Sequence, residues 1–143
     1  MKITAILLSA MAISGSAFAA GNAPVYTKAL LSGQQVFTSA CVHCHGDGLA
    51  GAPRAGDKTV WKDLIAEGFT DIAGSAMAGV RRMPPMGGEP ALYDMEVARA
   101  VNYMVEMAGG KFPEPTDASV KAARLDGEKR LKARIIKARQ ERK

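Results

Sequence analysis

The chain has 143 residues and a formal net charge of +5, a length that suits one small domain. The positive charge is concentrated at one end. Residues 111–143 contain eleven Lys and Arg against five Asp and Glu, whereas residues 1–110 contain eight against nine. Catalytic arrangements of carboxylates or nucleophiles are not visible in the sequence, so we expect no enzyme activity.

Residues 1–19 have the three-part pattern of a cleaved secretory signal peptide. Lys2 precedes an apolar run over residues 3–13, and small residues then lead to Ala19. The apolar run is too short to span a bilayer. We therefore predict export to the periplasm, which makes nucleic acid a poor candidate partner for the basic end.

The first predicted helix begins after Ser32, which has the spacing of a capping box with Gln35. Apolar residues then recur at helical spacing, at Val36, Phe37, Ala40, Cys41 and Cys44. This pattern places both cysteines on the inner face of the helix.

Residues 41–45 read Cys-Val-His-Cys-His, the spacing at which haem is attached covalently to a protein. The two thiols lie on one side of a helical turn, where each adds to a haem vinyl group. The imidazole of His45 is then held under the iron, and its other ring nitrogen needs an acceptor that fixes the tautomer. His43 is expected to be a solvent-facing spacer.

Three other interpretations of this motif fit less well. A redox dithiol of the thioredoxin kind would need flanking strands, which neither side supplies. A zinc site would need four ligands, and the only two cysteines and two histidines all lie within residues 41–45. A disulfide across two residues would be strained and would close almost no loop. We therefore predict one covalently attached haem c.

Glycines and capping residues divide the next part of the chain. Residues 46–56 contain four glycines and are predicted to form a loop. Asp57 is predicted to cap a short helix that ends at Gly68, and Thr70 to cap another. Residues 94–108 have the pattern of a strong amphipathic helix. No alternating strand pattern of useful length occurs, so the predicted fold class is all-α.

A haem held only by His45 would be open to small molecules, whereas a sixth protein ligand makes it an electron carrier. No histidine is left for that role, so we predict a methionine. Met83 precedes two prolines, and a residue before proline is held extended. Met86 is the alternative ligand. Four others fall at helical spacings and are expected in the core: Met77, Met95, Met104 and Met107.

The basic end, residues 111–143, has a thin apolar stripe that Gly127 interrupts, and we predict a helix with a solvated basic surface. Two interpretations stay open. The segment attracts an acidic protein or an anionic membrane surface, or it is only a solvated or disordered terminus.

Four motifs surround the haem motif in a fixed order: Gly33-x-x-x-Phe37, then Gly51-Ala52-Pro53-Arg54-x-Gly56-Asp57 with Trp61, then Met83-Pro84-Pro85-Met86-Gly87-Gly88, and Ala100-x-x-Tyr103-Met104. Over residues 32–108 the chain resembles the class I c-type cytochromes, and most closely the cytochrome c5 group. The resemblance implies the cytochrome c fold, in which small helices pack around one haem. Members of that group often carry a second cysteine pair after the methionine loop, which residues 89–96 lack.

The resemblance also implies roles for single residues. The first and last helices of the domain should cross, with Gly33 and Phe37 near Tyr103. The carbonyl of Pro53 should accept the second hydrogen bond of His45. Trp61 should lie beside a haem propionate. Arg54 either offsets propionate charge or is an ordinary exposed arginine. The predicted cofactor-binding residues are Cys41, Cys44, His45, Pro53, Trp61 and Met83, with His45 and Met83 as iron ligands.

The predicted organisation is a signal peptide at residues 1–19, a cytochrome c domain at 20–110 and a basic helical extension at 111–143. The predicted function is that of a periplasmic monohaem carrier, which passes one electron between redox proteins. The alternatives are a haem-binding subunit of a larger oxidoreductase, or a peroxidase-like or gas-binding haem protein if the methionine is labile.

Overall fold

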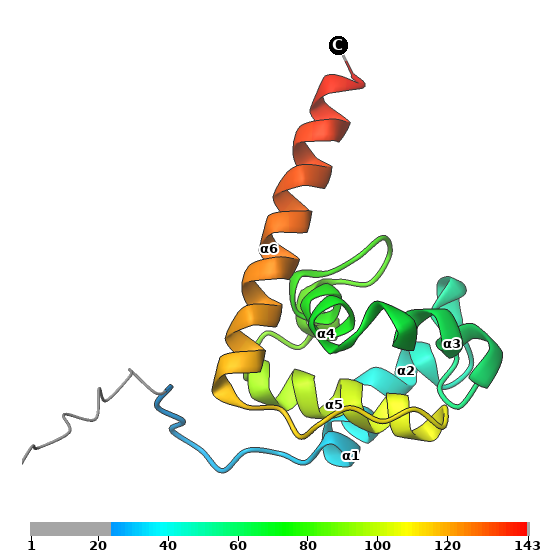
Figure 1. Cartoon of the computed structure of the whole chain (residues 1–143), viewed down its shortest axis with the longest axis vertical. Coiled ribbons are helices and arrows are strands. Elements are labelled where there is room, and N and C mark those ends of the chain that lie inside the picture. Colours follow the sequence, from blue (N-terminus) through cyan, green and yellow to red (C-terminus); the bar gives the residue numbers. More distant parts are fainter. Residues whose placement is uncertain (1–23, 143) are drawn as a thin grey trace, which may run out of the picture.

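The computed structural model describes residues 24–142, so the predicted signal peptide lies outside the described residues. The described part is helical, and its only extended pairing is a single bridge between Val80 and Met83. The α-helices, labelled in Figure 1, are α1 (Gly33–Val36), α2 (Val42–His45), α3 (Lys58–Glu67), α4 (Phe69–Ala78), α5 (Asp94–Met107) and α6 (Asp117–Gln140). The all-α prediction is confirmed. Among residues 24–142, no helix is both long and apolar enough to cross a membrane.

The helix that carries the cysteines is not regular throughout. Ser32 and Gln35 form the predicted capping box at the start of α1. Between α1 and α2, residues Phe37–Cys41 form a π-helical turn. The hydroxyls of Thr38 and Ser39 donate to the carbonyls four residues earlier, both at 2.9 Å, and so compete with the α-helical backbone bonds. A π-helical turn of this kind is often found at a functional site.

Helices α3 and α4 follow each other with one residue between them. Asp57 caps α3 as predicted, because its carboxylate accepts from the amides of Thr59 and Val60. The prediction that Thr70 caps the next helix is wrong. Gly68 turns the chain at φ +90° and is the N-cap of α4, which begins at Phe69. Only glycine takes this backbone conformation at little cost, so the turn occurs one residue after α3 ends.

The core lies between α5 and the helices that cross it. Gly33 of α1 touches α5 so closely that a Cβ there would lie 2.2 Å from the carbonyl oxygen of Arg99. The ring centroids of Phe37 and Tyr103 are 5.5 Å apart. The predicted crossing of the first and last helices of the domain is therefore confirmed. The larger buried apolar side chains are Val36, Phe37, Trp61, Met77, Met95, Val97, Val101, Met104, Val105 and Val120.

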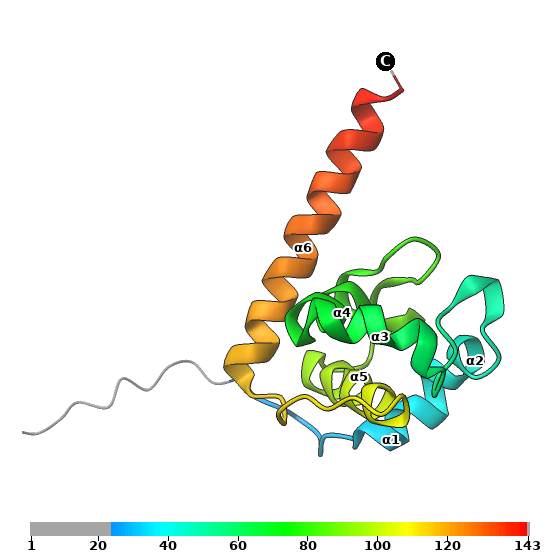
Figure 2. The ribbon, with the colours of Figure 1, turned by 45° about the vertical axis from the view of Figure 1, so that its right-hand side comes forward.

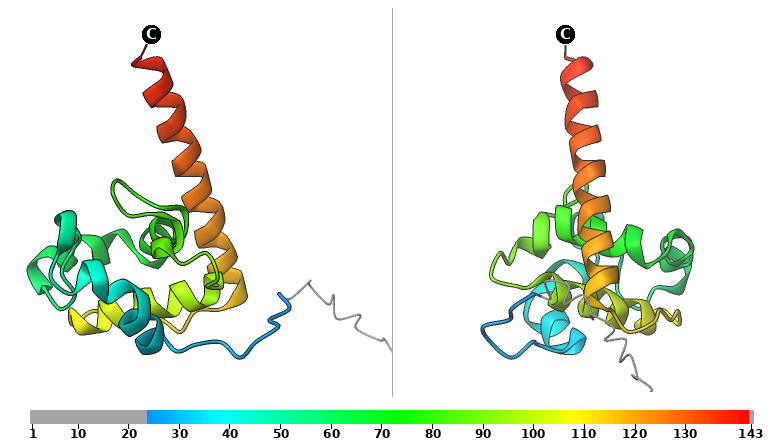
Figure 3. Two further views of the ribbon diagram at one scale, coloured as in Figure 1. Left: turned by 180° about the vertical axis from the view of Figure 1, so that it is seen from behind. Right: turned by 60° about the vertical axis from the view of Figure 1, so that its left-hand side comes forward.

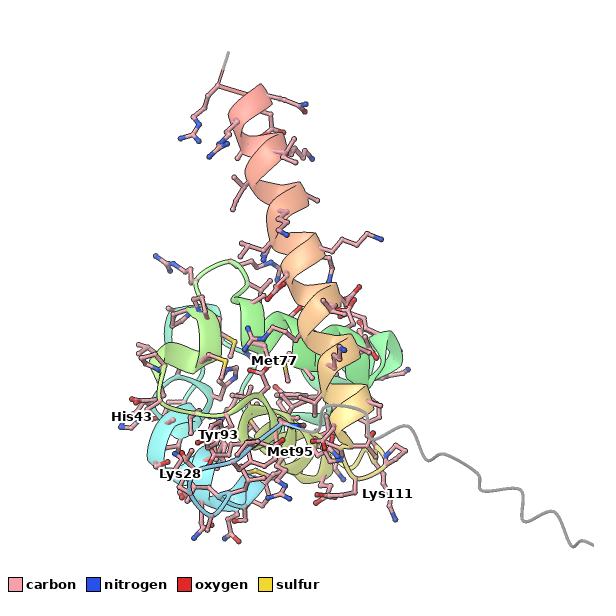
Figure 4. The ribbon with its side chains drawn as sticks, turned by 90° about the vertical axis from the view of Figure 1, so that its left-hand side faces the viewer. Lys28, His43, Met77, Tyr93, Met95 and Lys111 are labelled. Atoms are coloured by element: carbon pink, nitrogen blue, oxygen red, sulfur yellow. The ribbon has the colours of Figure 1, made fainter. Side chains whose placement is uncertain are left out.

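A buried carboxylate fixes the segment before α1, and the sequence analysis did not identify it. Glu96 of α5 is 0% exposed, and its two oxygens accept from the amides of Leu31, at 3.1 Å, and Tyr93, at 2.7 Å. The ammonium of Lys28 lies 3.7 Å from the same carboxylate. Lys28 and Tyr93 are labelled near each other in Figure 4. Glu96 therefore joins the entry of the chain to the start of α5.

Helix α6 packs against α4 along its first half, and its second half extends away from the rest of the protein (Figures 2 and 3). At the crossing, Gly74 of α4 faces Gly127 of α6. A Cβ on Gly127 would lie 2.2 Å from the carbonyl oxygen of Gly74, and one on Gly74 would lie 2.5 Å from that of Ala123. These two glycines allow the helix backbones to touch. The predicted helix is confirmed, but its surface is solvated all round only beyond Arg134, whose guanidinium still reaches the carbonyl of Gly79.

Candidate haem site

The proximal side of the site is built around His45, which is 8% exposed at the end of α2. Its Nδ1 lies 2.8 Å from the carbonyl oxygen of Pro53, the contact that the resemblance implies. Because a carbonyl only accepts, Nδ1 carries the proton, and Nε2 is the nitrogen left for a metal. The amide of Ala55 donates to the His45 carbonyl at 2.7 Å. The loop after the motif thus holds His45 through both its ring and its backbone.

The two thiols sit on the same helical segment as His45. Cys41 is half-buried, Cys44 is exposed, and neither forms a disulfide. Burial raises the pKa of the Cys41 thiol, and the nearby Cys44 raises it further. His43 is exposed, as predicted, with Nδ1 2.9 Å from the Ala40 carbonyl oxygen, and Figure 4 labels it at the edge of the molecule.

Trp61 supports the same loop from α3. Its indole is 2% exposed, and Nε1 donates to the carbonyl oxygen of Arg54 at 2.8 Å. The indole N–H is therefore used within the protein. Arg54 itself is exposed and lines an open hollow together with Pro53, Leu64 and Arg81. The positions of Trp61 and Arg54 relative to a haem propionate stay predictions.

The distal side is the loop between α4 and α5, which contains Met83. Met83 is half-buried, and its amide donates to the carbonyl of Val80 at 2.8 Å while its carbonyl accepts from the amide of Val80 at 3.0 Å. Pro84 follows in an extended conformation. A short 3-10 turn, Pro85–Gly88, then contacts the π-helical turn that ends at Cys41. The loop with Met83 is therefore rigid and lies beside the attachment motif.

The alternative ligand, Met86, is engaged by a residue that the sequence analysis did not single out. Nη2 of Arg124, on α6, lies 3.0 Å from the sulfur of Met86. Arg124 also donates from Nη1 to the carbonyl of Met77 at 3.1 Å and from Nε to the carboxylate of Asp94 at 2.8 Å. The hydrogen bond to Asp94 raises the pKa of Arg124. One guanidinium thus touches the end of α4, the distal loop and the start of α5.

The remaining methionines were predicted to be core residues, and three of them are. Met77, Met95 and Met104 are 0%, 6% and 5% exposed. The prediction for Met107 is wrong, because it is 40% exposed. In the last turn of α5, Met104 and Ala108 face the core, which leaves Met107 on the outer side.

The residues present fit a covalently attached haem. The thiols of Cys41 and Cys44 lie on one helical turn, an imidazole nitrogen is free beside them, and thioethers lie on the facing loop. Within residues 24–142, no cluster of three or more His, Cys, Asp or Glu side chains offers a competing metal site.

Comparison with known proteins gives the family. Residues 28–104 match the family model described as cytochrome c oxidase, cbb3-type, subunit III. The chain belongs to the c-type cytochromes. Its cofactor is therefore a covalently attached haem c, and Cys41 and Cys44 fit the attachment motif of that family. The predicted cytochrome c fold is confirmed.

Individual relatives agree with this assignment. Cytochrome c-555 of Chlorobaculum tepidum is 34% identical over 102 residues, which cover 68% of this chain and 93% of the relative. Cytochrome c5 of Azotobacter vinelandii is 36% identical over 75 residues, which cover 51% of this chain and 90% of the relative. The predicted resemblance to the cytochrome c5 group is thus confirmed.

Solved structures are similar as well. One of the matching chains comes from a crystal structure of an electron transfer complex of nitrite reductase with cytochrome c. The similar chain has 38% sequence identity and a TM-score of 0.51, and the match covers 53% of this chain and 93% of that one. These similarities support electron transfer between redox proteins as the function class.

Proposed function

We propose that this cytochrome is a periplasmic monohaem carrier that exchanges one electron at a time with redox proteins. The single C-x-x-C-H motif supports one haem, and the signal-like pattern of residues 1–19 supports export. The haem supplies the redox change between ferric and ferrous iron. The protein's own residues hold the haem, orient its proximal imidazole and restrain the loop on the other side. The observation that carries the proposal is the His45–Pro53 contact beside the two thiols.

In this proposal His45 and Met83 are the iron ligands. Support for Met83 comes from its backbone, which pairs with Val80 on one side and enters a proline pair on the other. A ligand held on so stiff a loop loses little entropy when it binds. Six-coordinate iron in both oxidation states would need little reorganisation during electron transfer, and a thioether ligand raises the potential.

Spectroscopy of the haem-loaded protein tests the ligand set. Met83→Ala is expected to abolish the far-red charge-transfer band of methionine-ligated ferric haem, whereas the control Met86→Leu keeps it. Retention of the band in Met83→Ala would transfer the role to Met86. The wild-type ferrous protein should not bind carbon monoxide rapidly, and rapid binding would instead favour the peroxidase-like or gas-binding alternative. A pigment that acid acetone extracts would contradict covalent attachment.

We further propose that the free half of α6 attracts an acidic face of a redox partner. Its exposed basic side chains lie on several sides of the helix and include Lys132, Lys137, Arg139 and Arg142. Ile135 and Ile136 are exposed among them, at 43% and 56%. A membrane-surface helix needs one coherent apolar face, and these charges interrupt any such face. Dispersed positive charge mainly accelerates encounter with an acidic protein.

Truncation of α6 tests this docking role, and the contacts of α6 determine which residues can be deleted. Removal of all of α6 would also remove the contacts of Arg124, so the deletion should cover residues 135–143 only. We expect the haem spectrum to be unchanged. Electron exchange with an acidic redox protein should be slower at low salt. A nitrite reductase is the first partner to test, because a structural neighbour is bound to one. The difference should vanish at high salt. An unchanged rate at low salt would contradict docking, and co-sedimentation with anionic vesicles would favour a membrane surface.

A second function is favoured by one observation. The matching family model is described as a subunit of a cytochrome c oxidase, which suits a fixed subunit of a larger oxidoreductase. Native electrophoresis of gently extracted cells, stained for haem, separates the two possibilities. A carrier migrates alone near its own mass, whereas a subunit migrates with a large complex.

A further inference from the structure

Helix α6 contacts both ends of the distal loop, which runs over residues 79–93. At the first end, Nη2 of Arg134 donates to the carbonyl of Gly79 at 2.6 Å. At the other end of the loop, Arg124 pairs with Asp94, the first residue of α5. The carbonyls of Met77 and Gly79 lie where α4 ends, and carbonyls at a helix end lack partners within the helix. The two arginines therefore satisfy these groups from a helix more than thirty residues further along the chain.

The contact that matters most is the one between Arg124 and the sulfur of Met86. Met83 and Met86 both belong to the distal loop, both are half-buried, and both pack against the same core. The sulfur of Met86 is the one that a guanidinium N–H approaches. To turn toward another partner, the Met86 side chain would have to give up this contact with the guanidinium.

We propose that α6 is a clasp on the distal loop, in which Arg124 holds Met86 aside and leaves Met83 as the thioether that reaches the iron. Arg124 is a positioning residue in this scheme, because it acts through its contact with the distal loop. The inference rests on the proposed ligation by Met83. It assigns to the basic extension a role inside the molecule, separate from any docking by its free half.

The anchor at the other end of α4 supplies a matched control. Arg130 pairs with Asp71 at 2.5 Å and with Asp126 at 2.7 Å, and Nη2 donates to the carbonyl of Asp71 at 2.8 Å. These contacts attach α6 to the start of α4 and involve no residue of the distal loop. If α6 only needed to be attached, Arg130→Ala and Arg124→Ala would have similar effects on the haem.

The first experiment measures imidazole binding to the ferric, haem-loaded, full-length protein. Imidazole competes with the methionine for the iron, so its apparent affinity reports how firmly the methionine is held. Arg124→Ala is expected to tighten imidazole binding about tenfold, which equals about 1.4 kcal/mol and is close to the loss of one charge-assisted hydrogen bond. For Arg130→Ala, the apparent affinity for imidazole should stay within about twofold of that of the wild type. Equal effects of the two variants, or none in Arg124→Ala, would overturn the proposal.

The second experiment tests whether Arg124 withholds Met86. In Met83→Ala the far-red band of methionine-ligated ferric haem should be absent, and in Met83→Ala combined with Arg124→Ala it should return as Met86 becomes free. Failure of the band to return overturns the proposal. If Arg124→Ala does not fold, Arg124→Lys takes its place, because lysine keeps the charge pair with Asp94 but lacks the guanidinium fork. Absence of the band in the wild type would contradict ligation by Met83, whereas a wild-type band with no response to Arg124 variants contradicts the clasp alone.

Discussion

The two sides of the haem site are held by contacts of very different range along the chain. On the proximal side, His45 bonds to Pro53 eight residues later, and Trp61 bonds to Arg54 seven residues earlier. On the distal side, Arg124 reaches Met86 across 38 residues and Met77 across 47, and Arg134 reaches Gly79 across 55. The proximal side therefore belongs to one continuous segment, whereas the distal side depends on a helix that follows the rest of the domain.

This difference matters for how the protein can be altered. Contacts within a continuous segment form wherever that segment folds, while contacts to a distant helix are lost when the helix detaches. Changes in α6 should therefore affect the distal ligand and leave the attachment motif unchanged. Changes in α3 should affect the support of His45 and leave α6 in place.

The largest effect is expected at Trp61, which supports the proximal loop. Trp61→Ala removes a side chain that is 2% exposed together with its hydrogen bond to Arg54, and should lower the free energy of unfolding by about 4 kcal/mol. Guanidinium denaturation of the ferric holoprotein measures this. The control Trp61→Phe keeps most of the buried ring and should lose only about 1–2 kcal/mol, mainly for the unpaired carbonyl of Arg54. Equal losses in both variants would mean that the hydrogen bond, rather than the burial, dominates.

The proximal side could be predicted from sequence because its signals are local. Cysteine and histidine spacing defines the attachment motif within five residues, and the side chain of Asp57 caps the start of α3 while the backbone turn at Gly68 ends it. The Pro53 contact followed from the resemblance, not from spacing. The helix irregularity at Phe37–Cys41 was not predicted, although Thr38 and Ser39 carry hydroxyls of the kind that compete with helical backbone bonds.

The distal side could be predicted only in part, because its partners are distant. The prolines after Met83 identified the loop, but nothing near them points to Arg124. In the sequence, Gly74 and Gly127 each only interrupt a helical pattern. The structure explains both glycines, because they lie where the backbones of α4 and α6 touch. One signal was available: Val120, Ala123 and Gly127 are the buried residues of α6, and their spacing of three and four is that of a helix that packs along one side.

A substitution at Gly127 should change the stability in opposite directions depending on whether α6 is a solvated helix or is packed against α4. If α6 were a solvated helix, Gly127→Ala would stabilise it by about 0.5–1 kcal/mol through helix propensity. In the structure the new Cβ would collide with the Gly74 carbonyl, so we expect a loss of about 2 kcal/mol instead. Thermal unfolding of the holoprotein measures the sign. The exposed position Ala122 supplies the control, since Ala122→Gly should lose about 1 kcal/mol by propensity alone.

The smallest effect is expected at Asp57, and it tests whether the proximal side responds by itself. Its carboxylate accepts from the amides of Thr59 at 3.0 Å and Val60 at 3.2 Å, so Asp57→Ala should lose about 1 kcal/mol of helix capping energy. Hydrogen exchange resolves where the loss occurs. Amides of α3 should exchange faster while those of α6 keep their protection, because α3 is joined to the proximal loop and α6 packs on α4. Faster exchange along α6 in the same variant would show that the two sides of the site unfold together and would remove the distinction between them.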